Sequence, residues 1–486
     1  MAVRGSVQPV AFLRIRLKAH CVYKRGDRLQ ITGEPASRTN VERRESDVRK
    51  AIAKFLFDNV MHDRLDYSQV VSVEQSVILP ERAMNPQQGE STMPHVLFVV
   101  NGYATMDDPV LGAKFRVQAR TLRDLGCRAG VLAVNQRTGE RMQHSSADGS
   151  LLIADEDDGI PIYRDYAWQL LPGMKHLDKA ADARVRIGMA ARAIEPYRDA
   201  HGLPDIIHAH GAKWSGCVAA CLRDKFRIPY VLTEHMSSHH RKLTHKWQRP
   251  IFEEAYRKSK RRLMVSHALG SRLQRAVGQA VTPWSAMPNV LDPLFAEAEP
   301  TPAAASDQPF RFLNLGRMDP VKGQDDLLKA FASAFRGDPS VRLTIGGDGE
   351  MRRELEALSN RLEIHEQVEF PGRLEREQVV EAMQQASAYV LSSHEETFAI
   401  PLVEATALGK PVIATRCGGP EEIVDETNGV LVKPRRPREL SRAMQWMRQN
   451  VQTFDPAEIR RRCLEQYSAA SVMGQCLELY NKVLDR

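Results

Sequence analysis

The stretch SSHEETFAIPLVEATALGKPVIATRCGGPEEIV, residues 392–424, decides the fold and carries the strongest chemical signal of the chain. Ser392 and Ser393 end an apolar run that is typical of a buried strand. Pro401 suits the first turn of a helix, and Gly409 suits its end. A strand followed by a helix places the loop between them at the carboxyl edge of a parallel sheet, where open α/β proteins bind ligands.

Two glutamates stand in this stretch. Glu396 falls in the loop, and Glu404 follows eight positions later in the first turns of the helix. Between them, the backbone N–H groups of Phe398, Ala399 and Ile400 are predicted to be exposed at the helix start. Carboxylates accept hydrogen bonds from the hydroxyls of a sugar or ribose, and amides donate to them. The alternative is that both glutamates are ordinary solvated residues near a helix N-terminus, where the helix dipole favours them.

A second cluster precedes this stretch by about 75 residues. Asn314-Leu315-Gly316-Arg317 closes an apolar run, and Lys322-Gly323 follows before a helical pattern. Arginine and lysine beside a helix N-terminus suit a diphosphate, because the guanidinium forks to two oxygens and the ammonium adds a point charge. A basic surface loop is the alternative.

Apolar runs alternate with helical patterns on both sides of these clusters, which predicts parallel sheets covered by helices. The first alternation starts at His95 and includes a helix over 215–227, and the second starts near Phe310. We therefore expect two Rossmann-like domains. In the second alternation the runs are FRFLNLGRM, a helix over 324–335, VRLTIGGDGE, a helix over 351–362, VEFPGRL, ASAYVLSS and PVIATRCGG.

The expected domain boundaries follow from composition. Residues 1–94 carry no recognisable chemistry and form an N-terminal extension of unknown role, with a strand over 10–15, a helix over 47–60 and Met93 as a candidate alternative start. Residues 95–295 hold 29 Lys and Arg against 20 Asp and Glu, whereas residues 296–486 hold 24 against 30. A basic first domain, 95–295, and an acidic second domain, 296–471, indicate different partners. A final helix, 472–486, is expected to cross back to the first domain.

Histidines end two strands of the first domain. Asp205-Ile-Ile-His208-Ala-His210 places two histidines on one face of a strand, and Thr233-Glu234-His235 ends the next. Adjacent strand ends with histidines suit a metal site or an acid/base site, while a single such histidine is more often a core residue. Gly112 lies in the first strand-to-helix loop, where a glycine lets backbone N–H groups approach an anion.

Several classes of protein are excluded or disfavoured. No apolar run approaches the ~20 residues that span a bilayer, and the first residues lack a signal peptide pattern. The seven scattered cysteines fit reduced thiols and argue against structural zinc. Arg352 occupies the third glycine position of a dinucleotide fingerprint, which disfavours a dehydrogenase. Asp155-Glu156-Asp157 has the D-x-D spacing of a metal site but is interpreted as solvated surface, and no nucleic-acid motif accompanies the basic charge.

Together, these segments resemble the retaining glycosyltransferases of GT-B fold, family four. The resemblance covers residues 95–486 and rests on the Gly112 loop, DIIHAH, TEH, PNVLD, NLGRMDPVKG, LTIGGDGE, VEFPGRL, SSHEETFAIPLVEA and GKPVIATRCGGPEEIV. It implies an α/β protein with two Rossmann-like domains that face an interdomain cleft. The sequence departs from the family where Gly-Phe-Gly often follows the first glutamate, because it reads Thr397-Phe398-Ala399.

The resemblance also implies roles for individual residues. Those assigned to catalysis are His210 and Glu396, which would contact the transferred sugar, with His208 as support. Those assigned to the donor nucleotide would bind the diphosphate, the ribose or the base, with Phe398, Ala399 and Ile400 contributing backbone N–H groups: Arg317, Lys322, Glu404, Gly112 and Arg373. No metal and no cofactor is expected.

The implied function is transfer of a sugar from a nucleoside diphosphate to a glycan or a lipid-linked acceptor, in cell-envelope or exopolysaccharide assembly. A nucleotide-sugar epimerase of the same fold and a non-catalytic scaffold stay open as alternatives. We expect a cytoplasmic protein that binds no nucleic acid, with peripheral attachment to the anionic inner face of the cytoplasmic membrane as a further option.

Overall fold

The computed structural model describes residues 21–25, 28–32, 93–104, 111–134, 152–165, 183, 187–188, 190–235, 248–300 and 309–486. The chain divides into two compact units, one formed by residues 1–88 and 131–203 and the other by residues 89–130 and 204–486. The strand and the helix expected within residues 1–94, over 10–15 and 47–60, lie outside the described residues.

The larger unit contains a six-stranded sheet in which every pair of neighbours is parallel. Its order is β13-β12-β11-β14-β15-β16. Along the chain, β11, β12 and β13 are therefore added from the centre toward one edge of the sheet, and β14, β15 and β16 toward the other. This is the 3-2-1-4-5-6 order of doubly wound dinucleotide-binding folds. The strands are β11 (Phe310–Leu315), β12 (Val341–Gly346), β13 (Val368–Gly372), β14 (Ala388–Leu391), β15 (Val412–Thr415) and β16 (Gly429–Val432).

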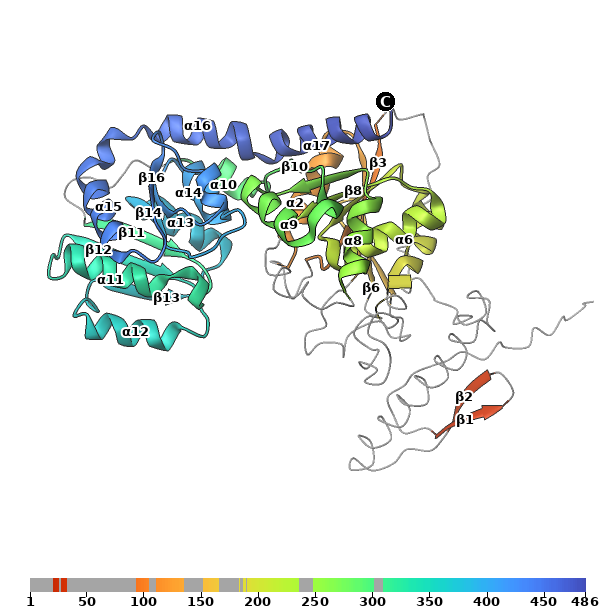
Figure 1. The fold of residues 1–486 in the computed structure, drawn as a ribbon, viewed down its shortest axis with the longest axis horizontal. Coiled ribbons are helices and arrows are strands. Elements are labelled where there is room, and N and C mark those ends of the chain that lie inside the picture. Colours follow the sequence, from red (N-terminus) through yellow and green to blue (C-terminus); the bar gives the residue numbers. More distant parts are fainter. Residues whose placement is uncertain are drawn as a thin grey trace, which may run out of the picture. The chain divides into compact units, whose positions relative to one another are not determined.

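Helices cover both faces of this sheet. On one face, Leu327, Phe331 and Met444 belong to a core that also contains Phe312 and Leu343 of the strands. In Figure 1, α12 lies below the strands and α16 above them. The helices are η5 (Pro320–Lys322), α11 (Gln324–Phe335), α12 (Arg352–Arg361), α13 (Arg376–Gln385), α14 (Ile400–Ala407), η6 (Gly419–Glu422), α15 (Pro437–Asn450), η7 (Val451–Thr453) and α16 (Pro456–Tyr467).

The larger unit also holds five parallel strands of a second sheet, in the order β10-β9-β8-β7-β3. All six residues of β3 are buried, as the continuous apolar run HVLFVV predicts. The strands are β3 (His95–Val100), β7 (Ile206–His210), β8 (Tyr230–Glu234), β9 (Arg261–Met264) and β10 (Ser285–Ala286). The helices and turns are α2 (Ala113–Asp124), the irregular turn η3 (Ala212–Gly216), α6 (Cys217–Phe226), α8 (Arg249–Lys258), α9 (His267–Val277), η4 (Gly278–Val281) and α10 (Pro293–Glu297).

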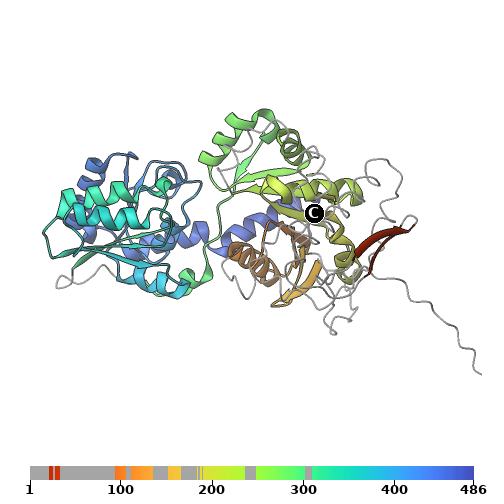
Figure 2. The ribbon, with the colours of Figure 1, turned by 90° about the horizontal axis from the view of Figure 1, so that it is seen from below.

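The last helix, α17 (Ala469–Val483), contacts α2, from which it is separated by more than 340 residues of sequence (Figures 1 and 2). Its buried face consists of Val472, Met473, Cys476 and Tyr480, at the spacing of one side of a helix. The Tyr480 hydroxyl lies 2.5 Å from Nδ1 of His208. The C-terminal residues are therefore part of the packing around the strand that carries the two predicted histidines.

The smaller unit is described only in part. Strand β6 (Ile160–Asp165) pairs in parallel with β4 (Arg128–Ala133) and antiparallel with β5 (Leu152–Asp157). Asp155 on β5 is exposed and paired with Arg164 at 3.0 Å. The other described elements are α5 (Ile194–His201) and the antiparallel pair β1 (Cys21–Arg25) and β2 (Arg28–Thr32). Among the described residues, no helix has the length and apolar character needed to cross a bilayer.

Candidate active site

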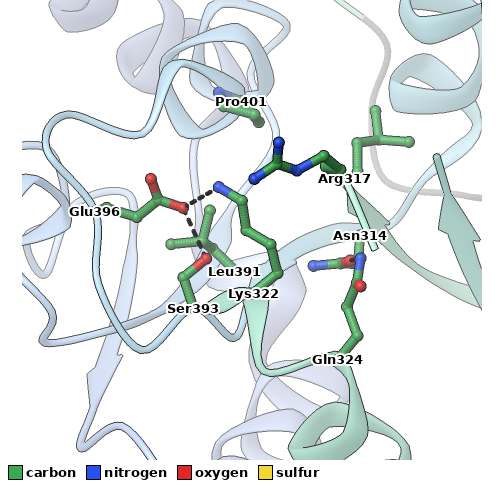
Figure 3. A pocket seen from close by; sticks show the side chains of 10 residues that line it. Asn314, Arg317, Lys322, Gln324, Leu391, Ser393, Glu396 and Pro401 are labelled. Carbon is green, nitrogen blue, oxygen red and sulfur yellow. Dashed lines mark hydrogen bonds and ion pairs between the residues drawn. The ribbon is translucent and has the colours of Figure 1, made fainter. Parts of the chain in front are cut away.

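A pocket of about 390 Å³ opens at the carboxyl ends of β11 and β14. These strands are neighbours in the sheet although β12 and β13 lie between them in sequence, so the chain leaves them in opposite directions. Such a topological switch point is where open α/β sheets bind ligands. The lining residues are Asn314, Leu315, Gly316, Arg317, Lys322, Gln324, Leu391, Ser393, Glu396 and Pro401 (Figure 3).

One carboxylate oxygen of Glu396 receives two hydrogen bonds inside the pocket. Lys322 Nζ lies 2.7 Å from Oε1, and Ser393 Oγ donates to the same atom at 2.7 Å. The backbone of Glu396 is held as well, because its N–H donates to the Cys417 carbonyl and its carbonyl accepts from Gly419 N–H. The loop from the end of β14 is thus fixed on both sides of Glu396.

A close approach of two loops explains one glycine at this site. Gly418 pairs with Glu396 in an isolated β-bridge, and a Cβ atom on Gly418 would lie 2.5 Å from the Glu396 carbonyl oxygen. The φ of Gly418 is +123°, a conformation that other residues rarely adopt. The glycine therefore lets the loop after β15 press against the loop that carries Glu396.

Arg317 and Lys322 bring two cations to the same pocket. Asp319 accepts from the Arg317 guanidinium at 2.5 and 2.7 Å through Oδ2 and from Val321 N–H at 3.0 Å through Oδ1. The Arg317 side chain is nevertheless 75% exposed. In Figure 3 the guanidinium and the Lys322 ammonium point into the same space, toward Pro401. Two cations that point into one space can both contact a polyanionic ligand.

The N-terminus of α14 adds backbone donors beside Pro401. Ala399, with φ +80°, precedes the helix, and Ile400 begins it. Within the described part of the chain, no hydrogen bond uses the N–H groups of Phe398, Ala399 or Ile400. Unpaired N–H groups at the positive end of a helix dipole favour an anion. The predicted helix start is confirmed, although the Phe398 and Ala399 side chains are buried.

Glu404 is buried within α14 and held by an ion pair that the sequence does not predict. Arg376, at the first position of α13, lies 2.8 Å from Glu404 Oε1 and 2.9 Å from Asp292 Oδ2. The guanidinium also stacks over the Phe295 ring at 4.7 Å. Burial raises the pKa of Glu404, and Arg376 acts in the opposite direction. An anionic Glu404 can accept a ligand hydroxyl with the oxygen that Arg376 does not occupy.

The predicted histidines form a buried cluster at the ends of β7 and β8. His210 Nδ1 lies 2.9 Å from His235 Nε2, and the rings of His208 and His210 stack with their centroids 4.1 Å apart. Thr233 Oγ1 lies 2.7 Å from His208 Nε2. Burial lowers the pKa of His208 to about 3 and the pKa of His210 well below its usual value. These imidazoles are therefore neutral near pH 7.

Two family models match consecutive parts of this chain. Residues 118–293 match the model described as Glycosyltransferase Family 4, and residues 296–465 match the model described as Glycosyl transferases group 1. The chain belongs to the group 1 glycosyltransferases. This confirms the family predicted from the Glu396 stretch and from the segments around it.

Two solved structures of other proteins share the fold. Sucrose-phosphate synthase from Thermosynechococcus elongatus is 19% identical, with a TM-score of 0.62, over 80% of this chain and 99% of that one. Anabaena HepE, solved in complex with UDP, is 18% identical with a TM-score of 0.58, over 80% of this chain and 100% of HepE. Similarity to these structures confirms the predicted GT-B fold.

Curated relatives match over a shorter range. An uncharacterized glycosyltransferase of Methanocaldococcus jannaschii is 31% identical over 49% of this chain and 63% of its own length. Across three curated relatives, the matched residues span 44 to 63% of the relative.

The remaining predicted residues lie outside the pocket lining. Gly112 precedes α2 with φ +69°, and a Cβ atom there would lie 2.5 Å from the Gly102 carbonyl oxygen, so only glycine fits. Arg373 follows β13 and is exposed. Among the described contacts, none joins His210 to the residues that line the pocket. The structure thus brings together Arg317, Lys322 and Glu396, and it places the histidines in a separate cluster.

The sequence did not predict two side chains that bind the two glutamates, Ser393 at Glu396 and Arg376 at Glu404, or Asp292, which binds Arg376. The contact of Ser393 with Glu396 could have been predicted, since Ser393 stands three residues before Glu396 in the same loop. The contact of Arg376 with Glu404 could not, because an arginine in the first turn of a helix with many polar residues is usually solvated.

Proposed function

We propose that this protein transfers a sugar from a nucleoside diphosphate sugar to an acceptor hydroxyl. The observation that carries the proposal is the convergence of Arg317, Lys322 and Glu396 at the topological switch point, beside the N-terminus of α14. Two cations and a helix N-terminus suit a diphosphate, and a carboxylate suits the hydroxyls of a sugar. In support, HepE has been solved with UDP and with UDP-glucose.

In this proposal the leaving diphosphate is stabilised by the chain's own cations. As the bond to the anomeric carbon breaks, negative charge grows on the β-phosphate, and Lys322 and Arg317 offset it. The 2.7 Å pair between Lys322 and Glu396 couples the two halves of the donor, because the cation that meets the phosphate also orients the carboxylate that meets the sugar. Glu404 accepts from the ribose, and Arg373 borders the base.

We propose further that the anomeric configuration is retained, that no divalent metal takes part, and that the acceptor is a glycan or a lipid-linked glycan of the cell envelope. One candidate cation cluster exists among the described residues, Asp325, Asp326 and His394. Its members are already paired, since Asp325 binds Lys329 at 2.8 Å and Asp326 lies 2.9 Å from His394. The two acids also suit the first turn of α11, where the helix dipole favours them.

Incubation with a panel of radiolabelled nucleotide sugars tests the proposal. We expect the label to move to an acceptor or to water, with release of nucleoside diphosphate, in EDTA as in Mg²⁺. Proton NMR of the first product should show the anomeric configuration of the donor. Glu396→Ala should abolish turnover, whereas Glu426→Ala, at an exposed position outside the pocket, should not. Release of an epimerised sugar nucleotide without transfer would instead indicate an epimerase.

The basic charge of residues 95–295 supports a membrane-proximal acceptor. Each Lys or Arg close to an anionic bilayer contributes ~1 kcal/mol to binding. We therefore expect the protein to sediment with phosphatidylserine-containing liposomes at low salt and to be released by high salt, which screens the attraction. Sedimentation that stays negligible at low salt would contradict this part of the proposal.

A further inference from the structure

His210 stands at one end of a chain of hydrogen bonds between buried side chains. Its Nδ1 lies 2.9 Å from Nε2 of His235, whose own Nδ1 lies 2.9 Å from Oδ1 of Asn289. At the other side of the His210 ring, Nε2 is covered by protein atoms and makes no hydrogen bond among the described residues. This series of hydrogen bonds therefore extends from Oδ1 of Asn289 to Nε2 of His210, which has no partner among the described residues.

The direction of this chain follows from the atoms at its start. Burial keeps the pKa values of both histidines well below the usual value, so each ring carries one N–H. Asn289 Oδ1 can only accept, which places the proton of His235 on Nδ1 and leaves its Nε2 as an acceptor. His210 must then donate through Nδ1, and its Nε2 carries a lone pair.

The burial of Nε2 supports the same direction. Buried N–H groups without a partner are rarer in proteins than acceptors without one. A bare lone pair at the end of the chain is therefore the less costly arrangement. It still carries the penalty of an unmade hydrogen bond, which a donor group of a ligand would remove. The donor that reaches Nε2 must displace part of the protein cover.

We propose that His235 and Asn289 are positioning residues that hold His210 in the tautomer with an unprotonated Nε2, ready to accept a hydrogen bond from a hydroxyl of the substrate. The hydroxyl is proposed on the basis of the glycosyl transfer above. The tautomer depends only on the three side chains. His235 and Asn289 act through His210 and need no contact with the substrate.

Nitrogen-15 NMR of imidazole-labelled protein at pH 7 tests the tautomer without any turnover. The His210 signals are assigned by their loss in His210→Gln. We expect Nε2 to show the shift of an unprotonated nitrogen in the parent protein. In His235→Leu, His210 Nδ1 has no acceptor to donate to, so we expect the proton to move to Nε2. A protonated Nε2 in the parent protein, or an unchanged tautomer in His235→Leu, would overturn the proposal.

His235→Gln provides the rescue, because its amide offers one acceptor and one donor as the neutral imidazole does. We expect His210 to keep the parent tautomer in His235→Gln. In Asn289→Leu we expect a smaller population of that tautomer. If glycosyl transfer is detected, His235→Leu should lower kcat about three- to ten-fold, the value of one hydrogen bond, with the affinity for UDP unchanged. His365→Leu, an exposed histidine, is the control, and thermal unfolding of each variant checks the fold. A kcat that falls equally in His235→Gln and His235→Leu would argue for a purely structural role.

Discussion

Glu404 is buried, which raises its pKa, and Arg376, 2.8 Å from its Oε1, favours the charged form of the carboxyl. Glu404→Gln keeps the shape of the side chain but removes the charge that strengthens a hydrogen bond from a ribose hydroxyl, worth ~1.5 to 3 kcal/mol. We expect the affinity for nucleoside diphosphate to fall roughly ten- to a hundred-fold, measured by calorimetry. Glu377→Gln, at an exposed position of α13, should bind like the parent. Equal affinities of Glu404→Gln and Glu377→Gln for nucleoside diphosphate would show that Glu404 does not contact the nucleotide.

The buried histidines should make the protein sensitive to acid. The pKa of His208 in the folded protein is about 3, below the usual value of 6.5. Between these two pH values the His208 ring stays neutral in the folded protein, whereas it is protonated in the unfolded chain. Stability from this residue is complete above pH 6.5 and is lost as the pH falls toward 3, by up to about 1.4 kcal/mol per pH unit. In urea unfolding between pH 7 and 4, His208→Gln should show a shallower loss than the parent. Parallel curves would contradict the assignment.

At the residue scale, the sequence predicted those side chains whose position in the chain defines their position in space. Lys322 and Glu396 lie in the segments that connect β11 and β14 to the helices after them, so the sheet places both at its carboxyl edge. Arg376 binds both Glu404 and Asp292, which lie 28 residues after it and 84 residues before it, and no local sequence pattern indicates these contacts. The predicted roles of the pocket residues and histidines remain proposals, since they depend on a bound donor.

At the scale of elements, glycine positions test how tightly the loops around the pocket pack. Gly323 has φ +60°, and a Cβ atom there would lie 2.3 Å from the Ser392 carbonyl oxygen. We expect Gly323→Ala to lower the free energy of unfolding by ~2 to 3 kcal/mol, through backbone strain and displacement of the loop after β14. Gly474→Ala is the matched control, because nothing lies within 4 Å of its Cβ position in α17, and it should raise stability by ~0.5 to 1 kcal/mol. The same sign for both, seen in urea unfolding, would contradict the geometry.

The elements themselves were largely predictable. The helix expected over 324–335 is α11 with the same bounds, and the apolar run HVLFVV is β3. The sequence did not predict that Ala399 adopts φ +80°, because alanine gives no signal for a left-handed conformation. A glycine would adopt this conformation without the strain that the Cβ atom of an alanine adds. The strand order across β11 and β14 also had to come from the structure, since a sequence lists strands without their neighbours.

At the scale of the whole molecule, every residue that lines the pocket lies between 314 and 401. We therefore expect a chain that begins at Met93 to bind nucleoside diphosphate with the affinity of the full chain. Calorimetry on both proteins, with circular dichroism to check the fold, makes the comparison. A folded Met93 chain that no longer binds would show that residues 1–92 contribute to the donor site.

The central claim is that the pocket at the switch point of β11 and β14 binds the diphosphate of a sugar nucleotide through its cations. Calorimetric titration of UDP, ADP and GDP into the parent protein, Lys322→Met and Lys433→Met tests it most directly. Lys433 is exposed and lies outside the pocket lining, so Lys433→Met removes one positive charge, as Lys322→Met does, without changing the pocket. We predict that at least one of the three binds the parent and Lys433→Met alike, and that Lys322→Met binds it about ten- to a hundred-fold more weakly. Equal binding to all three proteins, or no binding of any nucleotide to the parent, would contradict the account.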